Sequence, residues 1–215
     1  DTVISSDEVK TLYSGHEISG HTYSHPHLVG MPISSQLEEI TRCRAELEAL
    51  SVTLVRGMSL PYGGKNADTI TAMKAAGIAY SRNAGSMGGL SVPADFLDWN
   101  PTCHHSTAPK IIENFKNAWI NQSWNYGGLI EIWGHSFEFD RADNWQLAEE
   151  MCASLSGLSD VWYATNIEIC DYITAQRSLI LSQDQKTIFN PSAISVWVSS
   201  DGSAIEIKSG ESVRL

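Results

Sequence analysis

The chain has 215 residues, 42% of them hydrophobic and 18% charged, which excludes a disordered protein and allows one domain with a sizeable core and a small appendage. Lysine and arginine number 14 against 25 acidic residues, for a formal net charge of −11 with no basic cluster, which argues against nucleic acid or an anionic membrane surface as a partner. No apolar run approaches twenty residues, so the sequence predicts no membrane span.

The expected elements alternate, in chain order, between helices and short apolar strands. Capping residues at Ser35, Asn66 and Thr165 mark the starts of three helices. We expect helices over residues 1–15, 35–50, 66–77, 109–121, 144–155 and 165–176, and strands over 16–22, 52–55, 78–80, 129–133 and 161–164. This alternation predicts an α/β fold with a parallel sheet and helical crossovers, whose functional groups gather at the carboxyl ends of the strands.

From residue 177 onward the pattern changes to short alternating runs. They are separated by turn signals at Asp201-Gly202 and Ser209-Gly210 and are expected to be strands over 179–181, 187–189, 194–198 and 204–207. The sequence therefore predicts two domains, an α/β domain over residues 1–176 and a small antiparallel β appendage over 177–215. We expect the appendage to act as a structural lid or an interaction surface.

Histidines are concentrated near the start of the chain. His21 and His25 lie four residues apart with small or hydroxyl side chains nearby, and two imidazoles at short spacing can hold one zinc-like ion. His16 and Glu17 do not begin a zinc-protease HExxH motif, because the next histidine follows His16 by five residues. The four cysteines are widely spaced and form no CxxC motif, which leaves their pairing open.

Other polar side chains that could take part in catalysis or binding follow the expected strands. One of the loop histidines His104 and His105 is expected to line a pocket, and His135 ends an apolar strand. Glu138 and Asp140 could be taken for the acid/base pair of a glycosidase, but their position favours a polar loop that opens the next helix.

Two more segments carry polar or turn-forming residues after an expected strand: Arg56 followed by Pro61-Tyr62-Gly63, and Asp98-Trp99. Together with the segment from His21 to His25 and the apolar strand that ends at His135, they resemble the polysaccharide deacetylase family, also called NodB-homology or carbohydrate esterase family 4. The segment from His21 to His25 is similar to the family's His-Ser/Thr-x-x-His metal motif. Arg56 with the sequence Pro61-Tyr62-Gly63 is similar to its Arg-x-Pro-Tyr loop, with extra residues between the arginine and the proline. Asp98-Trp99 and the apolar strand that ends at His135 are similar to the two remaining motifs, and all four come in the family's order over about residues 6–176.

The resemblance implies a fold and an activity for residues 1–176. The fold would be a distorted (β/α) barrel of fewer than eight units, and the reaction would be hydrolysis of N-acetyl or O-acetyl groups on a carbohydrate or polysaccharide. A divalent metal, most often Zn with Co, Mn or Ni as alternatives, would be held by two histidines and an aspartate. The family works largely on cell-surface polysaccharides, which implies a secreted, periplasmic or cell-surface location.

The resemblance also implies roles for individual residues. His21 and His25 would bind the metal, and His135 would protonate the leaving group. The backbone N–H of Tyr62 would meet the oxyanion. The remaining implied residues tune the base or wall the substrate pocket, and they are Arg56, Asp98, Pro61 and Trp99. His105 is expected to line the same pocket for a different reason, because it belongs to a pair of loop histidines near Asp98-Trp99.

One family motif has no counterpart in this sequence. An Asp-Asp pair should end a strand well before the histidine motif, but only twenty residues precede His21. We expect a family member that lacks its N-terminal portion, with an open sheet at that side, and Asp98 is a less favoured substitute ligand. Two alternatives remain: a non-catalytic carbohydrate-binding or scaffold protein, and a metal-dependent hydrolase of C–N bonds on a non-sugar substrate.

Overall fold

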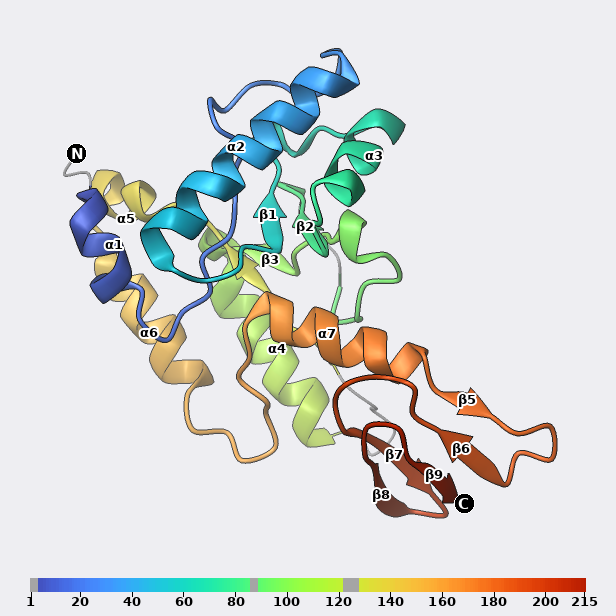
Figure 1. Cartoon of the computed structure of the whole chain (residues 1–215). Helices are drawn as coiled ribbons and strands as arrows, with labels where there is room; N and C mark the ends of the chain where they lie inside the picture. The colour runs from blue at the N-terminus through green and yellow to red at the C-terminus, as the bar shows by residue number, and fades with distance from the viewer. Residues whose placement is uncertain (1–3, 86–88, 122–127) are drawn as a thin grey trace. The chain divides into compact units, whose positions relative to one another are not determined.

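The computed structural model describes residues 4–85, 89–121 and 128–215, which form two compact units, Asp1–Tyr163 and Ala164–Leu215 (Figure 1). The helices of the first unit are α1 (Ser6–Leu12), α2 (Ile33–Ser51), α3 (Ala67–Ala75), α4 (Ala108–Asn121), α5 (Ser136–Ala142) and α6 (Trp145–Leu155). Its strands are β1 (Gly57–Ser59), β2 (Tyr80–Arg82), β3 (Cys103–His104) and β4 (Ile132–Trp133). Three 3₁₀ turns complete it: η1 (Pro61–Gly63), η2 (Phe96–Asp98) and η3 (His105–Thr107). None of the described helices combines the length and apolarity that a membrane crossing requires.

The strands of the first unit pair in parallel, as the alternating pattern predicts. β1 pairs with β2, Gly20 forms a parallel bridge to Met58 on one side, and Trp99 forms one to Arg82 on the other. β3 and β4 form a second parallel pair. The mixed α/β prediction is confirmed, and the described strands form no closed barrel.

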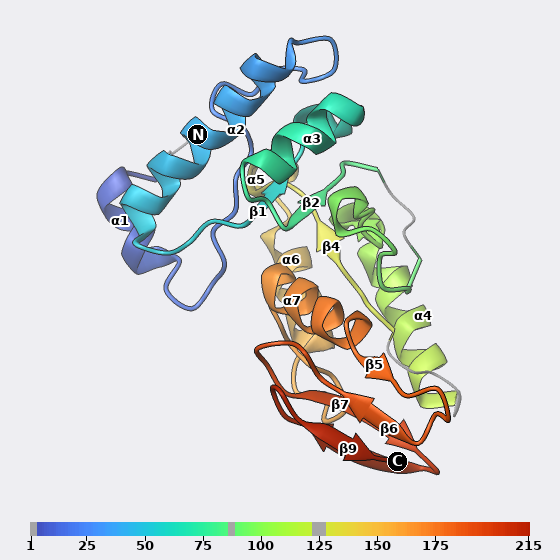
Figure 2. The same ribbon diagram turned by 45° about the vertical axis from the view of Figure 1, so that its right-hand side comes forward.

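Two apolar clusters lie among the described residues of the first unit. In the first, α2 and α3 lie side by side over β1, with Ile40, Met58 and Met73 almost fully buried (Figures 1 and 2). Between the two helices the Thr69 hydroxyl donates to Gln36 Oε1 at 2.7 Å, which satisfies a polar pair inside this core. In the second cluster, Ile112 of α4 packs with partly buried side chains of β4 and α6.

Several predicted boundaries are wrong, because pairing and local caps override the apolar pattern. Residues 52–55 form no strand: α2 ends at Ser51, Val52 adopts a left-handed conformation with φ 58°, and Leu54 is 68% exposed. The strand lies instead at Gly57–Ser59, where a Cβ on Gly57 would overlap the ring of Tyr80.

Other boundaries shift for similar reasons. Helix α2 begins at Ile33, with Pro32 as its N-cap, so the predicted capping box at Ser35 lies inside the helix. The predicted strand over 16–22 reduces to the bridge at Gly20, and β2 begins at Tyr80. Residues 161–164 form no strand, because the Tyr163 hydroxyl closes a turn by donating to the Leu155 carbonyl at 2.5 Å.

The second unit contains α7 (Asn166–Arg177), whose predicted Thr165 capping box is present, and five short strands. The strands are β5 (Ile180–Leu181), β6 (Thr187–Phe189), β7 (Val196–Ser200), β8 (Ser203–Ile207) and β9 (Ser212–Arg214). All pairings are antiparallel, in the orders β5-β6-β9 and β7-β8, as predicted for this part of the chain. The unit begins earlier than the predicted appendage, because α7 belongs with these strands: the Tyr172 hydroxyl accepts from Trp197 N at 3.1 Å (Figure 2).

Candidate active site

His21 is fixed at the carboxyl end of the parallel ladder. The preceding Gly20 exchanges hydrogen bonds of 2.8 Å with the backbone of Gly57 and Ser59. His21 Nδ1 lies 2.9 Å from the Ser59 carbonyl and 2.7 Å from its hydroxyl oxygen. Because a carbonyl can only accept, these contacts place the proton on Nδ1 and leave the lone pair of Nε2 available. Burial holds the pKa of His21 below its usual value despite the Ser59 contact, so the ring is neutral, as a metal ligand must be.

His25 lies next to His21 in a strained loop. The ring centroids of the two histidines are 4.8 Å apart, and Tyr62 contacts His25 at 4.9 Å. Thr22, His25 and Tyr62 all have positive φ, between 58° and 62°, which costs energy for residues other than glycine. Such strain is common where a backbone is held for function. His27 also stacks on the Tyr62 ring, with the two ring centroids 3.7 Å apart.

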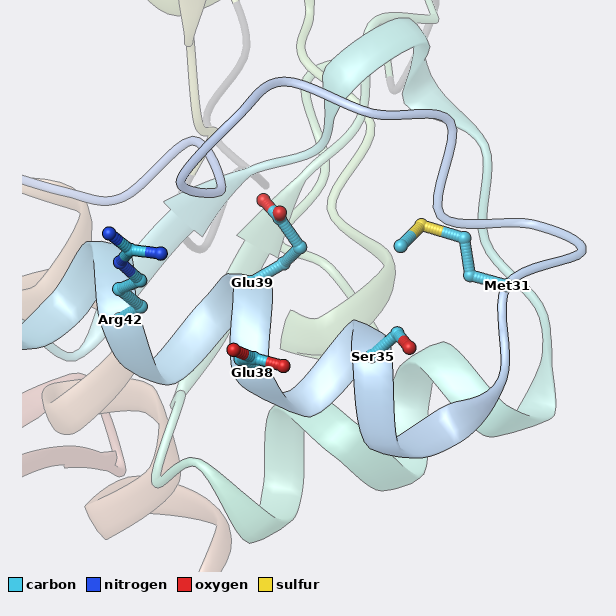
Figure 3. Close-up of a pocket in the computed structure, with 5 residues that line it drawn as sticks. All are labelled: Met31, Ser35, Glu38, Glu39 and Arg42. Atoms are coloured by element: carbon cyan, nitrogen blue, oxygen red, sulfur yellow. The ribbon is translucent and has the colours of Figure 1, made fainter.

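Helix α2 anchors the loop between the two histidines. Glu39 accepts hydrogen bonds from the Ser24 N–H at 2.8 Å and from the Ser24 hydroxyl at 2.7 Å. Arg42 donates to the Tyr23 hydroxyl at 2.9 Å and lies over its ring. Figure 3 shows Glu39 and Arg42 on this helix, where they line a hollow together with Met31, Ser35 and Glu38. Although partial desolvation raises it, the pKa of Glu39 is held below its usual range by the two bonds from Ser24, which keeps the acceptor ionised.

The strand next to β1 carries a guanidinium group, that of Arg82, and this group lies near the buried carboxyl group of Glu131. Arg82 is directly opposite Ser59 in the β1–β2 register, and its Nε lies 3.9 Å from Glu131 Oε1. Arg82 also lies 5.0 Å from the centre of the Trp133 ring. Burial raises the pKa of Glu131 to about 7 even though Arg82 opposes the shift, and its Oε2 has no hydrogen-bond partner within the described residues. The charge of Arg82 also lowers the pKa of His21, which shows that the two groups influence one another.

The predicted Asp98-Trp99 motif lies on a neighbouring part of the ladder. Asp98 pairs with Lys65 and accepts from Asn83 Nδ2 at 2.6 Å. The Lys65 contact, together with Asn83 and against partial desolvation, holds the pKa of Asp98 below its usual value. Trp99 is 1% exposed and packs against Phe96 and Tyr80, so its ring lies in the core.

The predicted Arg-x-Pro-Tyr counterpart is divided between the two ends of β1. Pro61 is buried and Tyr62 is 60% exposed, both after the carboxyl end of the strand. Arg56 precedes the amino end, where its carbonyl accepts from the N–H of Ala79 at 2.7 Å. Of the residues implied by the resemblance, ring contacts therefore bring together His21, His25 and Tyr62.

His135 belongs to a cluster of three histidines around one carboxylate. Glu138 Oε2 lies 3.0 Å from His104 Nε2, 3.3 Å from His135 Nδ1 and 3.5 Å from His105 Nδ1. Although partial desolvation raises it, hydrogen bonds from the His135 backbone and His104 hold the pKa of Glu138 below its usual value. Burial, followed by the neighbouring His104, lowers the pKa of His105. We call these four residues the histidine–glutamate cluster.

The sequence interpretation missed Ser59, Arg82, Glu131 and the part played by Glu138. Ser59 occupies the position two residues before Pro61 where Arg-x-Pro-Tyr has its arginine, so counting backwards from the proline could have identified it. Arg82 supplies a guanidinium at the same level of the next strand, which only the pairing register reveals. Glu138 follows His135 by three residues and caps the start of α5, a spacing visible in the sequence.

The comparisons with known proteins point to one family. Residues 3–81 match the family model for polysaccharide deacetylases, and no curated protein matches the chain. A candidate polysaccharide deacetylase from Mycobacterium smegmatis has a similar fold, with a TM-score of 0.58, 20% identity, and coverage of 80% of this chain and 68% of that one. The resemblance read from the histidine motif is thus confirmed.

More distant structures are also similar. The alignment with a Streptococcus pyogenes deacetylase solved with acetate has a TM-score of 0.42 and 17% identity, and covers 45% of this chain and 43% of that one. A CE4 family pseudoenzyme from Bacillus anthracis gives a TM-score of 0.46 and 10% identity, with 77% and 49% coverage. The chain thus spans less than half the length of these two proteins.

Proposed function

We propose that this chain, whose residues 3–81 match the polysaccharide deacetylase family, takes part in metal-dependent removal of acetyl groups from a carbohydrate. The observation that carries the proposal is the pair His21 and His25. Ser59 directs one ring nitrogen of His21 away from the backbone, and the second imidazole lies 4.8 Å from the first. The family match covers the same segment.

The residues around this pair suit a divalent cation. His21 is neutral, partly buried and oriented through Nδ1, the arrangement in which metal-binding histidines are normally held. Within the described residues no carboxylate joins His21 and His25 in a three-ligand group. A bound cation there would supply Lewis acidity toward an acetyl carbonyl and toward water. Zn²⁺ fits imidazole ligands best, and Co²⁺, Mn²⁺ and Ni²⁺ are alternatives.

The remaining groups would bind and protonate the substrate. The left-handed backbone of Tyr62 brings the Pro61–Gly63 turn beside His25. There the backbone N–H of Tyr62 can donate to a developing oxyanion. His135 would protonate the leaving nitrogen through Nε2, because Nδ1 faces Glu138. Arg82, opposite Ser59 in the strand register, would supply the guanidinium that position 59 lacks, and its charge opposes the rise that burial causes in the pKa of the neighbouring Glu131. The exposed ring of Tyr62 offers an apolar face to a sugar.

A second function is binding of a carbohydrate without its hydrolysis. It would follow if the described residues, in which no carboxylate joins His21 and His25 in a three-ligand group, hold the whole site. A third function, hydrolysis of C–N bonds on a non-sugar substrate, uses the same groups. We expect the active protein to be secreted, periplasmic or on the cell surface.

The experiment measures acetate released from N-acetylglucosamine oligomers as zinc is added stepwise to the metal-free protein. We expect release that a chelator abolishes and that His25→Ala lowers at least about 100-fold, because the ligand is removed. His16→Ala is the matched control, since this exposed histidine lies outside the site, and its rate should equal that of the parent. Oligomer binding without acetate release would establish the non-catalytic function. Release from non-sugar amides alone would establish the third.

A further inference from the structure

The histidine–glutamate cluster has the composition of a transition-metal site. It lies on segments other than those that carry His21 and His25: His104 ends β3, His105 begins η3, and His135 precedes α5. His104, His135 and Glu138 each offer one ligand atom, and these atoms lie within 4.8 Å of one another. Imidazole nitrogen and carboxylate oxygen are common ligands of zinc.

The spacing around Glu138 is close to that of a tetrahedral site. With metal–ligand bonds of about 2.0–2.2 Å, two ligand atoms of a tetrahedron lie about 3.3–3.6 Å apart. The three nitrogens lie 3.0, 3.3 and 3.5 Å from Glu138 Oε2. Within the described residues His104, His135 and Glu138 form a three-ligand group, and the His105 ring would have to move toward the other two imidazoles to become the fourth ligand.

His105 supplies an independent observation. It is 7% exposed, and its Nδ1 forms no hydrogen bond within the described residues although it is directed toward Glu138. An imidazole nitrogen buried in this way costs free energy unless something binds it. The ring packs against Gly134, where a Cβ would overlap Nδ1, so the absence of a side chain at position 134 makes room for this histidine.

We propose that His104, His105, His135 and Glu138 bind a second divalent transition metal, separate from the ion assigned to His21 and His25. His104, His135 and Glu138 supply three ligands, and the imidazole of His105, whose Nδ1 lies 3.5 Å from Glu138 Oε2, would move in as the fourth. A metal-bound imidazole no longer cycles between its neutral and protonated forms near neutral pH. Occupancy of this site and action of His135 as a general acid therefore exclude one another.

The test measures Co²⁺ binding by visible absorption, which reports tetrahedral coordination, and then displacement by Zn²⁺. The starting protein carries His21→Ala and His25→Ala, which remove the other metal site. We expect it to bind one Co²⁺. Adding Glu138→Gln or His104→Ala should weaken binding by more than about 100-fold, since loss of an outer-shell partner alone costs 10–100-fold. Adding His16→Ala should leave the affinity unchanged.

The two metal assignments can fail separately. No Co²⁺ bound by the starting protein, or equal binding after Glu138→Gln, would overturn the proposal while leaving His21 and His25 in place. If the parent protein releases no acetate at any zinc concentration while the starting protein still binds Co²⁺, that result would instead count against the proposed function. Circular dichroism identifies any variant that does not fold. X-ray absorption of the zinc-loaded starting protein then counts the imidazole ligands without a further substitution. We expect three, and fewer than three would overturn the proposal.

Discussion

At the scale of single residues, Glu131 is a carboxyl group that the fold keeps in an unfavourable environment. Its side chain is 13% exposed, and its ion pair with Arg82 is long at 3.9 Å. Its pKa rises to about 7 from the ordinary value of 4.5, because burial outweighs the attraction of Arg82. The folded chain thus holds a proton on Glu131 over a range in which the unfolded chain has lost it. Folding is therefore favoured by low pH at this residue.

The resulting pH dependence can be measured. The contribution of Glu131 to the free energy of unfolding is fully present below about pH 4.5 and is lost as the pH rises to about 7. At 1.36 kcal/mol per pKa unit, the total loss is about 3 kcal/mol. We expect Glu131→Gln to remove this part of the decline in the free energy of unfolding, measured with urea between pH 5 and 8. Glu149→Gln, at an exposed position on α6, should leave the decline unchanged. An unaltered slope in the Glu131 variant would show that its carboxyl group ionises normally in the fold.

At the scale of elements, capping residues predict where helices begin more reliably than apolar runs predict where strands lie. The Thr165 box and the Asn66 cap are found where predicted, because a side chain three residues away decides each one. The apolar run at 52–55 forms no strand, since a three-residue parallel strand is defined by its partner and not by its own pattern.

The same distinction separates the site residues. The histidine motif is local, so the sequence identifies His21 and His25 directly. Arg82, Glu131 and His104 acquire their environments from pairing across β1–β2 and β3–β4, which spacing along the chain does not encode. Burial of Trp99 in the core likewise depends on Tyr80 from the neighbouring strand.

Helix α2 should control the metal affinity of the His21–His25 pair. Glu39→Gln keeps the size of the side chain, but an amide nitrogen cannot accept the second bond from Ser24, so the loop carrying His25 loosens. We expect Zn²⁺ to bind about 10-fold more weakly, the low end of outer-shell effects, when binding is measured in a Glu138→Gln background. Glu38→Gln is the matched control, because it changes the same helix and hollow without touching the loop (Figure 3). Equal effects of the two substitutions would mean that the charge of the helix, and not the Ser24 bonds, sets the affinity.

At the scale of the whole molecule, the chain combines two units whose strands pair differently, in parallel in the first and antiparallel in the second. The first uses short parallel strands with helical crossovers, and its carboxyl ends carry the candidate ligands. The second unit is built from antiparallel strands, whose hairpin β7–β8 turns at Asp201 and Gly202, both with positive φ. This turn is of the kind that favours glycine, as the sequence predicts.

A change at this turn should stay within the second unit. Gly202 has φ 78°, so Gly202→Ala places a Cβ in the left-handed region and should cost about 1–2 kcal/mol. Hydrogen exchange of the β7 and β8 amides should then become faster by about 5- to 30-fold, because these hydrogen bonds open more often. The amides of β1 and β2 should exchange as before, since each unit forms its own set of internal contacts. Ser203→Ala, the exposed neighbouring residue, serves as the control. Faster exchange in β1 and β2 of the Gly202 variant would show that the two units unfold as one.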